Sequence, residues 1–288
     1  MTEPQSLPAD PLKFEDWAGK AGQRWLSNLD TFEGTIAPVG EALLARAAFQ
    51  PGQRVVDIGC GGGATSLAIA RAVGPDGSVL GMDISPDLVN ECSRRATGQG
   101  LANARFICGD AATTSAPEAP FDRLCSRFGT MFFDDPVAAF TNLRSMVKPG
   151  GRIDLAVWGP SLANPWMLEG MAVVRRYVEM APPIPRAPGP FAFEDLDYLN
   201  DILAKSGFRD VEIAEVRGKL PVAGKGSTPA RAVHFLQNGL ASGQVLMEQP
   251  EAVREAATAE LLDMYSRHHQ PGEGVMMGLF ARLVSAVA

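Results

Sequence analysis

Short apolar runs alternate with amphipathic stretches through the middle of the chain. The apolar runs occupy residues 54–58, 78–83, 104–108, 121–126 and 152–158. Between them, apolar residues recur at helical spacing in residues 64–73, 86–97 and 136–147. Strands that alternate with helices in this way form a parallel sheet with right-handed crossovers and both faces buried. The pattern therefore predicts an α/β fold built on a doubly wound, Rossmann-like sheet.

The sequence on either side of this alternation follows other patterns. Residues 1–49 start with three prolines in the first 12 positions, expected to be a frayed tail, and continue with apolar spacing that predicts a helical cover. Residues 159–192 combine a Met-rich helical stretch with five prolines between positions 182 and 190, which predicts a lid insertion. Residues 50–158 are then the central unit, and residues 193–288 complete the sheet and add a further helical cover.

The C-terminal region contains one stretch that the pattern leaves open. Helices are predicted over 194–205, 229–247 and 250–268, with a sixth strand over 211–216. The apolar run 275–287 fits either a seventh strand or a terminal helix by its spacing.

Several helix boundaries have local causes in the sequence. Ser85 is placed to cap the helix that begins at Pro86, and Asp134 or Asp135 to cap the one that begins at Pro136. The segment 149–151, Pro-Gly-Gly, is expected to stop that third helix.

A glycine turn follows the first strand directly. Gly59, Gly61 and Gly63 let the backbone approach a ligand closely, and Asp57 adds a carboxylate beside them, which is the pattern of a nucleotide cradle. The spacing also fits the dinucleotide-binding turn. Asp83 ends the second strand, where an acid can accept hydrogen bonds from both ribose hydroxyls. Because either kind of nucleotide uses such an acid, an NAD-dependent oxidoreductase remains open at this point.

The third strand ends in Gly109-Asp110-Ala111, where a carboxylate can accept from an adenine amino group. With the glycine turn, Asp83 and the segment 148–151 in register, the chain resembles the class I S-adenosylmethionine-dependent methyltransferases over residues 50–158. Residues 126–136 are similar to the small-molecule enzymes of ubiquinone and menaquinone biosynthesis. The resemblance implies S-adenosyl-L-methionine as cofactor, residues 50–158 as its binding core, and an antiparallel last strand beside strand six.

The resemblance also implies a set of cofactor contacts. The methionine end is expected at Asp57, Gly59, Gly61, Gly63 and the Cys60 backbone, the ribose at Asp83, and the adenine at Ile84, Asp110 and Ala111.

Residues after strand four lie at the expected mouth of the site, because ligands bind beyond the carboxyl ends of parallel strands. Ser126 and Arg127 are candidates there. Arg127 can bind the carboxylate of a substrate or of the cofactor's methionine end, or can form a structural ion pair with Asp134 or Asp135.

Aromatic residues are candidates for covering the two ligands. Trp25, with Trp17 and Arg24, can close over the methionine tail, although a helix face packed on the sheet is the alternative. Phe132, Phe133 and Trp166 are candidates for an acceptor pocket, with the protein core as the alternative.

Composition narrows the class of protein. With 46% hydrophobic and 20% charged residues, the chain has the composition of a globular protein. A net charge of -7 disfavours a nucleic acid partner, and no apolar run approaches the roughly 20 residues of a membrane span. No secretory signal is visible at the N-terminus, so we expect a cytoplasmic protein. A homodimer is one possible assembly.

Cysteine and histidine usage excludes some chemistry. Four cysteines form no Cys-x-x-Cys pair, so we expect reduced thiols and no metal site. Cys60, Cys108 and Cys125 are expected to be small buried apolar residues. His234 and His268 are weak candidates for a catalytic base, and no base is identifiable.

The expected function is methyl transfer to an O, C or N atom of a small, largely apolar metabolite by in-line displacement. Orienting two bound reactants can lower a barrier by about 7 to 11 kcal/mol, so no catalytic triad is required. Two alternatives stay open, the oxidoreductase and a noncatalytic binding protein with a methyltransferase fold.

Overall fold

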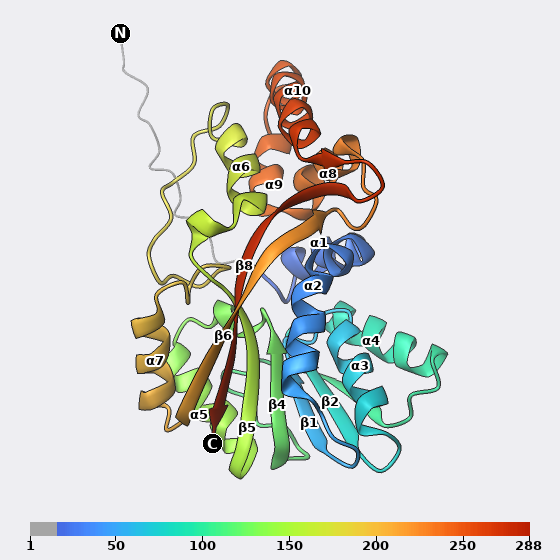
Figure 1. Ribbon diagram of the computed structural model, residues 1–288, viewed down its shortest axis with the longest axis vertical. Helices are drawn as coiled ribbons and strands as arrows, with labels where there is room; N and C mark the ends of the chain where they lie inside the picture. Colours follow the sequence, from blue (N-terminus) through green and yellow to red (C-terminus); the bar gives the residue numbers. More distant parts are fainter. Residues whose placement is uncertain (1–15) are drawn as a thin grey trace.

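One mixed sheet organises residues 16–288, the part of the chain that the computed structural model describes. The strand order is β3-β2-β1-β4-β5-β8-β6, with β7 paired to β8 (Figure 1). The predicted frayed tail lies outside the described residues. The strands are β1 (Arg54–Ile58), β2 (Ser78–Asp83), β3 (Ala104–Cys108), β4 (Phe121–Arg127), β5 (Val147–Trp158), β6 (Arg209–Val222), β7 (His269–Gln270) and β8 (Gly274–Val287).

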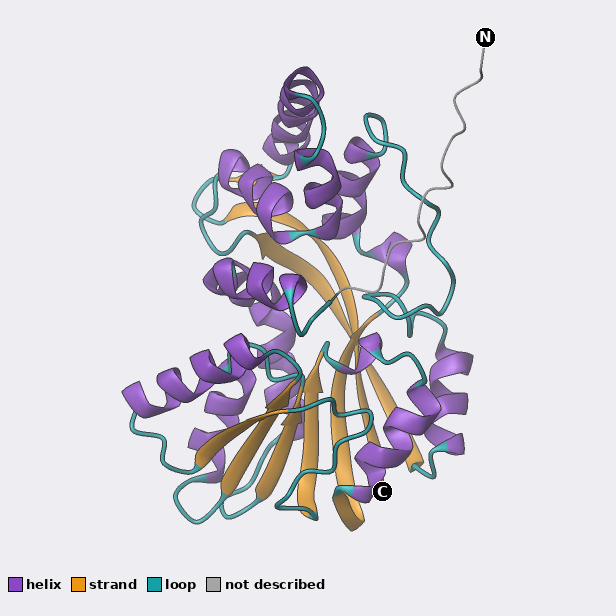
Figure 2. Cartoon of the chain, turned by 180° about the vertical axis from the view of Figure 1, so that it is seen from behind, coloured by secondary structure: helices purple, strands orange, loops and turns teal. Residues whose placement is uncertain are grey.

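Helices cover both faces of this sheet. In the described residues they are α1 (Lys20–Ser27), α2 (Leu29–Ala47), α3 (Ala64–Val73), α4 (Pro86–Gly98), α5 (Pro136–Ser145), α6 (Pro165–Val174), α7 (Leu196–Lys205), α8 (Pro229–Gly239), α9 (Ala241–Met247) and α10 (Glu251–Arg267). Helices α2, α3 and α4 lie on one face, and α5 and α7 lie together on the other (Figures 1 and 2). The doubly wound α/β prediction is confirmed.

The last strand is antiparallel, as the resemblance implied. Strands β1 to β5 pair in parallel, whereas β8 runs antiparallel to both β5 and β6. The run 275–287 is therefore a strand and not a terminal helix. Strand β6 is longer than predicted, because residues 212–222 pair one by one with residues 275–285 of β8.

Two helices differ from the prediction. The predicted helix over 229–247 divides at Leu240 into α8 and α9. Helix α5 ends at Ser145, and the segment 148–151 lies inside β5 instead of stopping the helix. Val147 pairs with Phe121 of β4, and the Gly150 N–H donates to the Ala288 carbonyl oxygen. The pairing of Val147 with β4 takes the backbone out of the helix before Pro149 is reached.

A helical layer stands above the carboxyl ends of the parallel strands. Strands β6 and β8 extend past the other strands toward α6, α8, α9 and α10 (Figure 1). Tyr265 of α10 is fully buried in this layer, where its hydroxyl lies 3.2 Å from the position a Cβ would take at Gly170 of α6. The helix that begins the predicted lid insertion therefore packs against the predicted C-terminal cover. No helix within residues 16–288 is long and apolar enough to cross a membrane.

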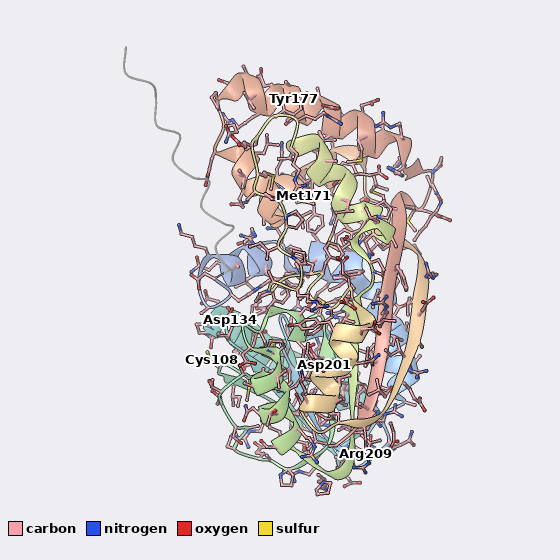
Figure 3. All side chains as sticks on the ribbon, turned by 90° about the vertical axis from the view of Figure 1, so that its left-hand side faces the viewer. Cys108, Asp134, Met171, Tyr177, Asp201 and Arg209 are labelled. Atoms are coloured by element: carbon pink, nitrogen blue, oxygen red, sulfur yellow. The ribbon has the colours of Figure 1, made fainter. Side chains whose placement is uncertain are left out.

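The cysteines are free thiols, and one of them departs from expectation. Cys60, Cys92 and Cys125 are buried, but Cys108 is exposed at the end of β3 (Figure 3). The prediction that Cys108 is buried was wrong, because β3 is the edge strand of the sheet. No cluster of three or more His, Cys, Asp or Glu residues that could hold a metal ion occurs within residues 16–288.

The two predicted helix caps can now be assigned. The Ser85 hydroxyl accepts a hydrogen bond from the Leu88 N–H at 3.4 Å, and Asp135, not Asp134, accepts from the Ala138 N–H at 3.0 Å.

Replacing the second cap should have a measurable cost. Asp135→Ala is expected to lower the free energy of unfolding by about 1 kcal/mol, because the Ala138 N–H loses its acceptor. Urea denaturation measures the change. Asp134→Ala is the matched control, since Asp134 is also exposed and does not cap α5. An equal loss in both variants would show that the cap is not the cause.

Candidate cofactor site

Asp83 fixes the glycine turn against the end of β2. Its Oδ2 accepts a hydrogen bond from the Gly61 N–H at 2.8 Å, and its Oδ1 accepts from the Ser85 N–H at 2.9 Å. The side chain is buried, and burial raises the pKa of the carboxyl above its ordinary value. Each carboxylate oxygen keeps a second lone pair. Asp83 can therefore hold the turn and still accept from a ligand hydroxyl.

The glycines of the turn have different roles. Gly59 has φ +65°, and a Cβ there would lie 2.7 Å from the Cα of Gly129. Gly59 therefore makes a close approach to the loop after β4, while its contact with the cofactor stays a prediction. Gly61 has φ +56°, and a Cβ there would lie 3.6 Å from Nε1 of Trp25. Trp25 therefore lies over the turn, as the lid hypothesis expected.

Asp57 is a buried acid below the turn. Its carboxylate accepts a hydrogen bond from the Ser66 hydroxyl at 2.5 Å. Burial raises the pKa of Asp57 to about 6, although the Ser66 hydrogen bond and the Arg127 guanidinium both lower it. At neutral pH the protein thus holds a carboxylate that is costly to ionise, beside the predicted position of the cofactor's positively charged methionine end.

The cost of ionising buried Asp57 leads to a prediction for how the stability of the protein depends on pH. The pKa of Asp57 is higher in the folded protein than its ordinary value of 3.8, so folded protein binds the proton more tightly. Stability is lost as the pH rises from about 4 through 6. The raised pKa of Asp57 corresponds to about 3 kcal/mol of stability lost at neutral pH. Asp57→Asn removes this loss, but its weaker hydrogen bond to Ser66 costs about 1 kcal/mol.

Urea denaturation of Asp57→Asn and the parent protein between pH 4 and 8 tests this expectation. The variant should be more stable by about 2 kcal/mol at pH 7 to 8, and the difference should disappear near pH 4. A difference that is constant across this range would mean that Asp57 titrates normally.

Cys60 is held by the protein itself. Its N–H donates to the Met82 carbonyl oxygen at 3.2 Å, and its carbonyl oxygen accepts from the Gly63 N–H at 2.9 Å. Its Sγ lies 3.9 Å from Sγ of Cys92, which itself donates to the Gly61 carbonyl oxygen. That contact with Cys92, followed by burial, raises the pKa of the Cys60 thiol. The cysteine pair packs α4 against the turn.

The predicted adenine contacts lie next to Asp83. Ile84 is 40% exposed, which is unusual for a large apolar side chain inside a fold and suits a flat apolar ligand. The Asp110 carboxylate accepts from the Ala112 N–H at 2.9 Å, and the Asn142 amide donates to the Ala111 carbonyl oxygen at 3.0 Å. The site thus combines a carboxylate that can accept from hydroxyl groups, an exposed apolar side chain and an acidic loop. The residues present therefore fit a nucleoside such as S-adenosylmethionine.

Arg127 is the exceptional charge of the site. Its guanidinium lies against α2, where Nη1 is 2.8 Å from the position a Cβ would take at Gly40. Burial lowers its pKa, while the carboxylates of Glu33 and Asp57 favour the charged form. Within residues 16–288 no hydrogen bond or ion pair joins this guanidinium to another residue. The predicted alternative, an ion pair with Asp134 or Asp135, was wrong, because both are exposed at the start of α5, as Figure 3 shows for Asp134.

Ser126 has a structural bond. It is fully buried, and its hydroxyl donates to the Ile58 carbonyl oxygen at 2.7 Å, which ties the end of β4 to the end of β1. A cofactor contact through this hydroxyl stays a prediction.

Aromatic rings connect the sheet to the helical cover. Phe132 meets Trp17 edge-on at 5.0 Å, Trp17 meets Trp25 at 5.8 Å, and Trp25 stacks on Phe32 at 3.9 Å. The indole N–H groups of Trp17 and Trp25 are buried and have no partner in the described residues. Such donors are costly unless a ligand completes them.

A second aromatic group lies at the end of β5. Phe128 stacks on Trp158 at 4.1 Å, and Trp158 contacts Trp166 of α6 at 5.3 Å. The Trp166 indole N–H is also buried without a partner among the described residues. Phe133 instead packs on Phe140 of α5 at 6.2 Å, on the core side.

The structure does not bring the histidines to the strand ends. His234 is exposed on α8 beside Asn238, and His268 follows α10, where its Nε2 lies 2.7 Å from Oε2 of Glu169. Neither is placed to take a proton from an acceptor at β4.

Sequence reasoning missed residues that act on the site from neighbouring elements. Gly129 accommodates Gly59, and Arg95 of α4 bonds to the carbonyl oxygen of Gly62 at 3.1 Å. Neither has a sequence signal, because each is defined by a contact between distant segments.

Comparison with known proteins agrees with this site. A family model described as a methyltransferase domain matches residues 55–151. Nocamycin O-methyltransferase from Saccharothrix syringae is 30% identical over 246 residues, which are 82% of this chain and 85% of the relative. Aklanonic acid methyltransferase DauC from Streptomyces sp. strain C5 is 36% identical over 118 residues, 41% of this chain and 54% of the relative.

Further matches support the subgroup and the fold. The demethylmenaquinone methyltransferase of Geobacillus kaustophilus is 32% identical over 111 residues, 38% of this chain and 47% of the relative. The chain thus spans about half the length of this relative and of the aklanonic acid enzyme. The crystal structure of YcgJ from Bacillus subtilis shares the fold, with a TM-score of 0.56, 19% identity, and coverage of 86% of this chain and 97% of that chain.

These findings decide the question that Asp83 alone left open. The glycine turn, the acid after β2 and the antiparallel last strand agree with a relative that spans most of the chain. The chain belongs to the S-adenosylmethionine-dependent methyltransferases of the small-molecule type, whose cofactor is S-adenosyl-L-methionine.

Proposed function

We propose that the protein methylates an ionised oxygen atom, foremost a carboxylate, of a small and largely apolar metabolite. One observation carries this proposal, the guanidinium of Arg127 at the end of β4, which no hydrogen bond or ion pair joins to another residue within residues 16–288. A cation in a partly desolvated position favours an anionic ligand and binds a carboxylate with two parallel hydrogen bonds. The rest of the proposal concerns which ligand brings that carboxylate and how it reacts.

The choice of oxygen is supported by the relative that covers most of the chain. Its alignment over 82% of the chain necessarily extends well beyond residues 50–158 and into the elements that cover the acceptor side. That relative is named an O-methyltransferase, and the aklanonic acid enzyme is named for an acid.

That the acceptor oxygen is already ionised is supported by the described residues at the strand ends, none of which is a candidate base. A carboxyl group with an ordinary pKa near 4 is ionised at neutral pH and needs no proton removed before it attacks. Asp57 and Asp83 are engaged by Ser66, Gly61 and Ser85, and the histidines lie elsewhere. The residues at the strand ends therefore suit an acceptor that is already a nucleophile.

The apolar body of the acceptor is supported by the aromatic groups. Phe132, just after β4, packs against Trp17, and Trp158 at the end of β5 packs against Trp166. Aromatic faces of this kind bind flat apolar molecules, and the unpartnered indole N–H groups can donate to their oxygen substituents. A net charge of -7 gives no attraction for a nucleic acid, so we include a small molecule as the substrate class.

The chain's residues contribute position and exclusion of water. The sulfonium of the cofactor supplies the electrophilic methyl carbon. Asp83 would hold the ribose, Trp25 would cover the methionine end, and Arg127 would orient a carboxylate at the end of β4. Arranging the two reactants in line is the main catalytic contribution expected of this site.

A product assay tests the proposal. Purified protein is incubated with S-adenosylmethionine and three matched aryl compounds that carry a carboxylate, a phenol or a primary amine. Mass spectrometry should show one added methyl group on the acid, and mild alkali should release it as methanol, since only a methyl ester hydrolyses under these conditions. Methylation of the amine alone would contradict the proposal, and cofactor binding without turnover of any acceptor would favour the noncatalytic alternative.

A further inference from the structure

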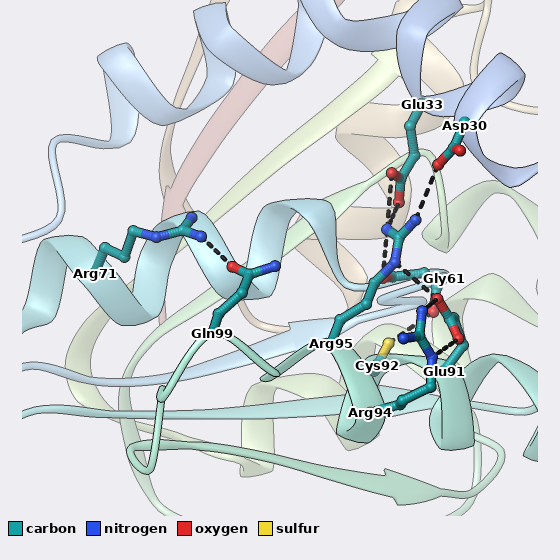
Figure 4. A network of polar contacts seen from close by, with 10 residues as sticks. Asp30, Glu33, Gly61, Arg71, Glu91, Cys92, Arg94, Arg95 and Gln99 are labelled. Atoms are coloured by element: carbon teal, nitrogen blue, oxygen red, sulfur yellow. Dashed lines mark hydrogen bonds and ion pairs between the residues drawn. The ribbon is translucent and has the colours of Figure 1, made fainter. Parts of the chain in front are cut away.

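One guanidinium joins three elements at the edge of the cofactor site. Arg95 of α4 donates from Nη1 to both carboxylate oxygens of Glu33 at 2.9 Å, and from Nη2 to Asp30 at 3.1 Å. Its Nε donates to Glu91 at 2.9 Å, and Nη1 also donates to the carbonyl oxygen of Gly62 at 3.1 Å (Figure 4). Asp30 and Glu33 belong to α2, and Gly62 belongs to the glycine turn.

This contact is more than a surface ion pair. The side chains of Arg95 and Glu33 are only 18% and 17% exposed, so solvent screens their interaction weakly. A Cβ at Gly62 would lie 2.8 Å from Oε1 of Glu33 and would collide with Leu29. Helix α2 therefore rests directly on the turn, and Arg95 fastens the two together.

The fastened helix carries the cover of the site. Helix α1 leads into α2 through Asn28 alone, and its Trp25 lies over Gly61 while stacking on Phe32 of α2. The position of Trp25 above the turn follows from the position of α2.

Glu33 also faces a second cation. Its carboxylate favours the charged form of Arg127, although no ion pair joins the two side chains. Both carboxylate oxygens of Glu33 are held by Arg95 and not by Arg127.

We propose that Arg95 is a positioning residue for cofactor binding, which clamps α2 on the glycine turn. It touches neither ligand. Its role goes beyond the proposed acceptor and rests only on binding of the family's cofactor. Failure of this inference would therefore leave the ester-forming proposal untouched, and the reverse also holds.

Binding of S-adenosylhomocysteine, measured by calorimetry without acceptor, tests the clamp. Arg95→Met should raise the Kd about tenfold, the equivalent of ~1.4 kcal/mol. In turnover assays the KM for S-adenosylmethionine should rise with it, while kcat changes less than about threefold, because loss of uniform binding leaves kcat in place. Arg94→Met is the matched control. Arg94 bonds to the same Glu91 but is 73% exposed and contacts neither α2 nor the turn, so its Kd should change less than about twofold.

A second variant separates positioning from general stability. Glu33→Gln removes the charge from the same contact and should also raise the Kd. Because the two residues act as one unit, the double variant should be no worse than Arg95→Met alone. The inference is overturned if Arg95→Met lowers the Tm while the Kd stays constant, or if the two changes in Kd simply add. Should Arg95→Met not fold, an unchanged Kd in Glu33→Gln overturns it equally.

Discussion

Asp83→Ala is expected to weaken binding of S-adenosylhomocysteine about 100-fold, or ~2.7 kcal/mol. The carboxylate has two tasks that an alanine cannot perform. It would accept from the ribose hydroxyls, which would be left unpaired in a partly buried site. It also accepts from the N–H groups of Gly61 and Ser85, so the glycine turn and the start of α4 lose a common anchor.

Calorimetry with the purified variant gives the comparison, and Asp76→Ala is the control. Asp76 is an exposed acid in the turn before β2, at the opposite end of the strand from Asp83. Its replacement changes the net charge equally and should leave the Kd constant. Asp83→Asn should fall between the two, because an amide oxygen can still accept one of the hydrogen bonds. Unaltered affinity in Asp83→Ala would refute the ribose assignment.

The central sheet could be predicted from the sequence because its signals are local. Strands β1, β2 and β3 have the predicted bounds, and α3 does too, since each apolar run is bordered by a turn residue or a cap. The boundary of α5 could not be found in this way. Val147 leaves the helix because Phe121 offers it a sheet partner, and that partner lies 26 positions away in the sequence.

The residues of the site also fall into two groups, those that local sequence signals predict and those that depend on contacts between distant segments. Asp57 and Asp83 lie at the carboxyl ends of β1 and β2, and the glycines follow β1 directly, so their approach to one another follows from the parallel sheet. The contact of Gly59 with Gly129 and the clamp of Arg95 on Glu33 depend on how separate segments meet. Cys108 was wrongly predicted to be buried for the same reason, because the local sequence of β3 does not show that this strand forms the edge of the sheet.

Arg127→Met should separate stability from function. A guanidinium without a protein partner costs free energy in the folded state, and methionine fills a similar volume without charge. Replacing charged groups in such positions by apolar ones is often neutral or stabilising, so the free energy of unfolding should stay constant or rise by about 1 kcal/mol. Activity should instead fall by at least about 100-fold, the loss expected when one charged group that orients a reactant is removed.

The way in which activity is lost identifies the ligand of Arg127. If the guanidinium holds the acceptor carboxylate, the Kd for S-adenosylhomocysteine will stay constant, and kcat/KM will fall for acids but not for a neutral phenol of the same shape. If it holds the methionine carboxylate, the Kd will rise and all acceptors will be affected alike. Arg127→Lys keeps the charge without the planar fork and should recover only part of the activity. A strongly destabilised but fully active variant would show instead that Arg127 is a structural residue of the sheet. Its charge would then be stabilised by the protein itself and not by a ligand.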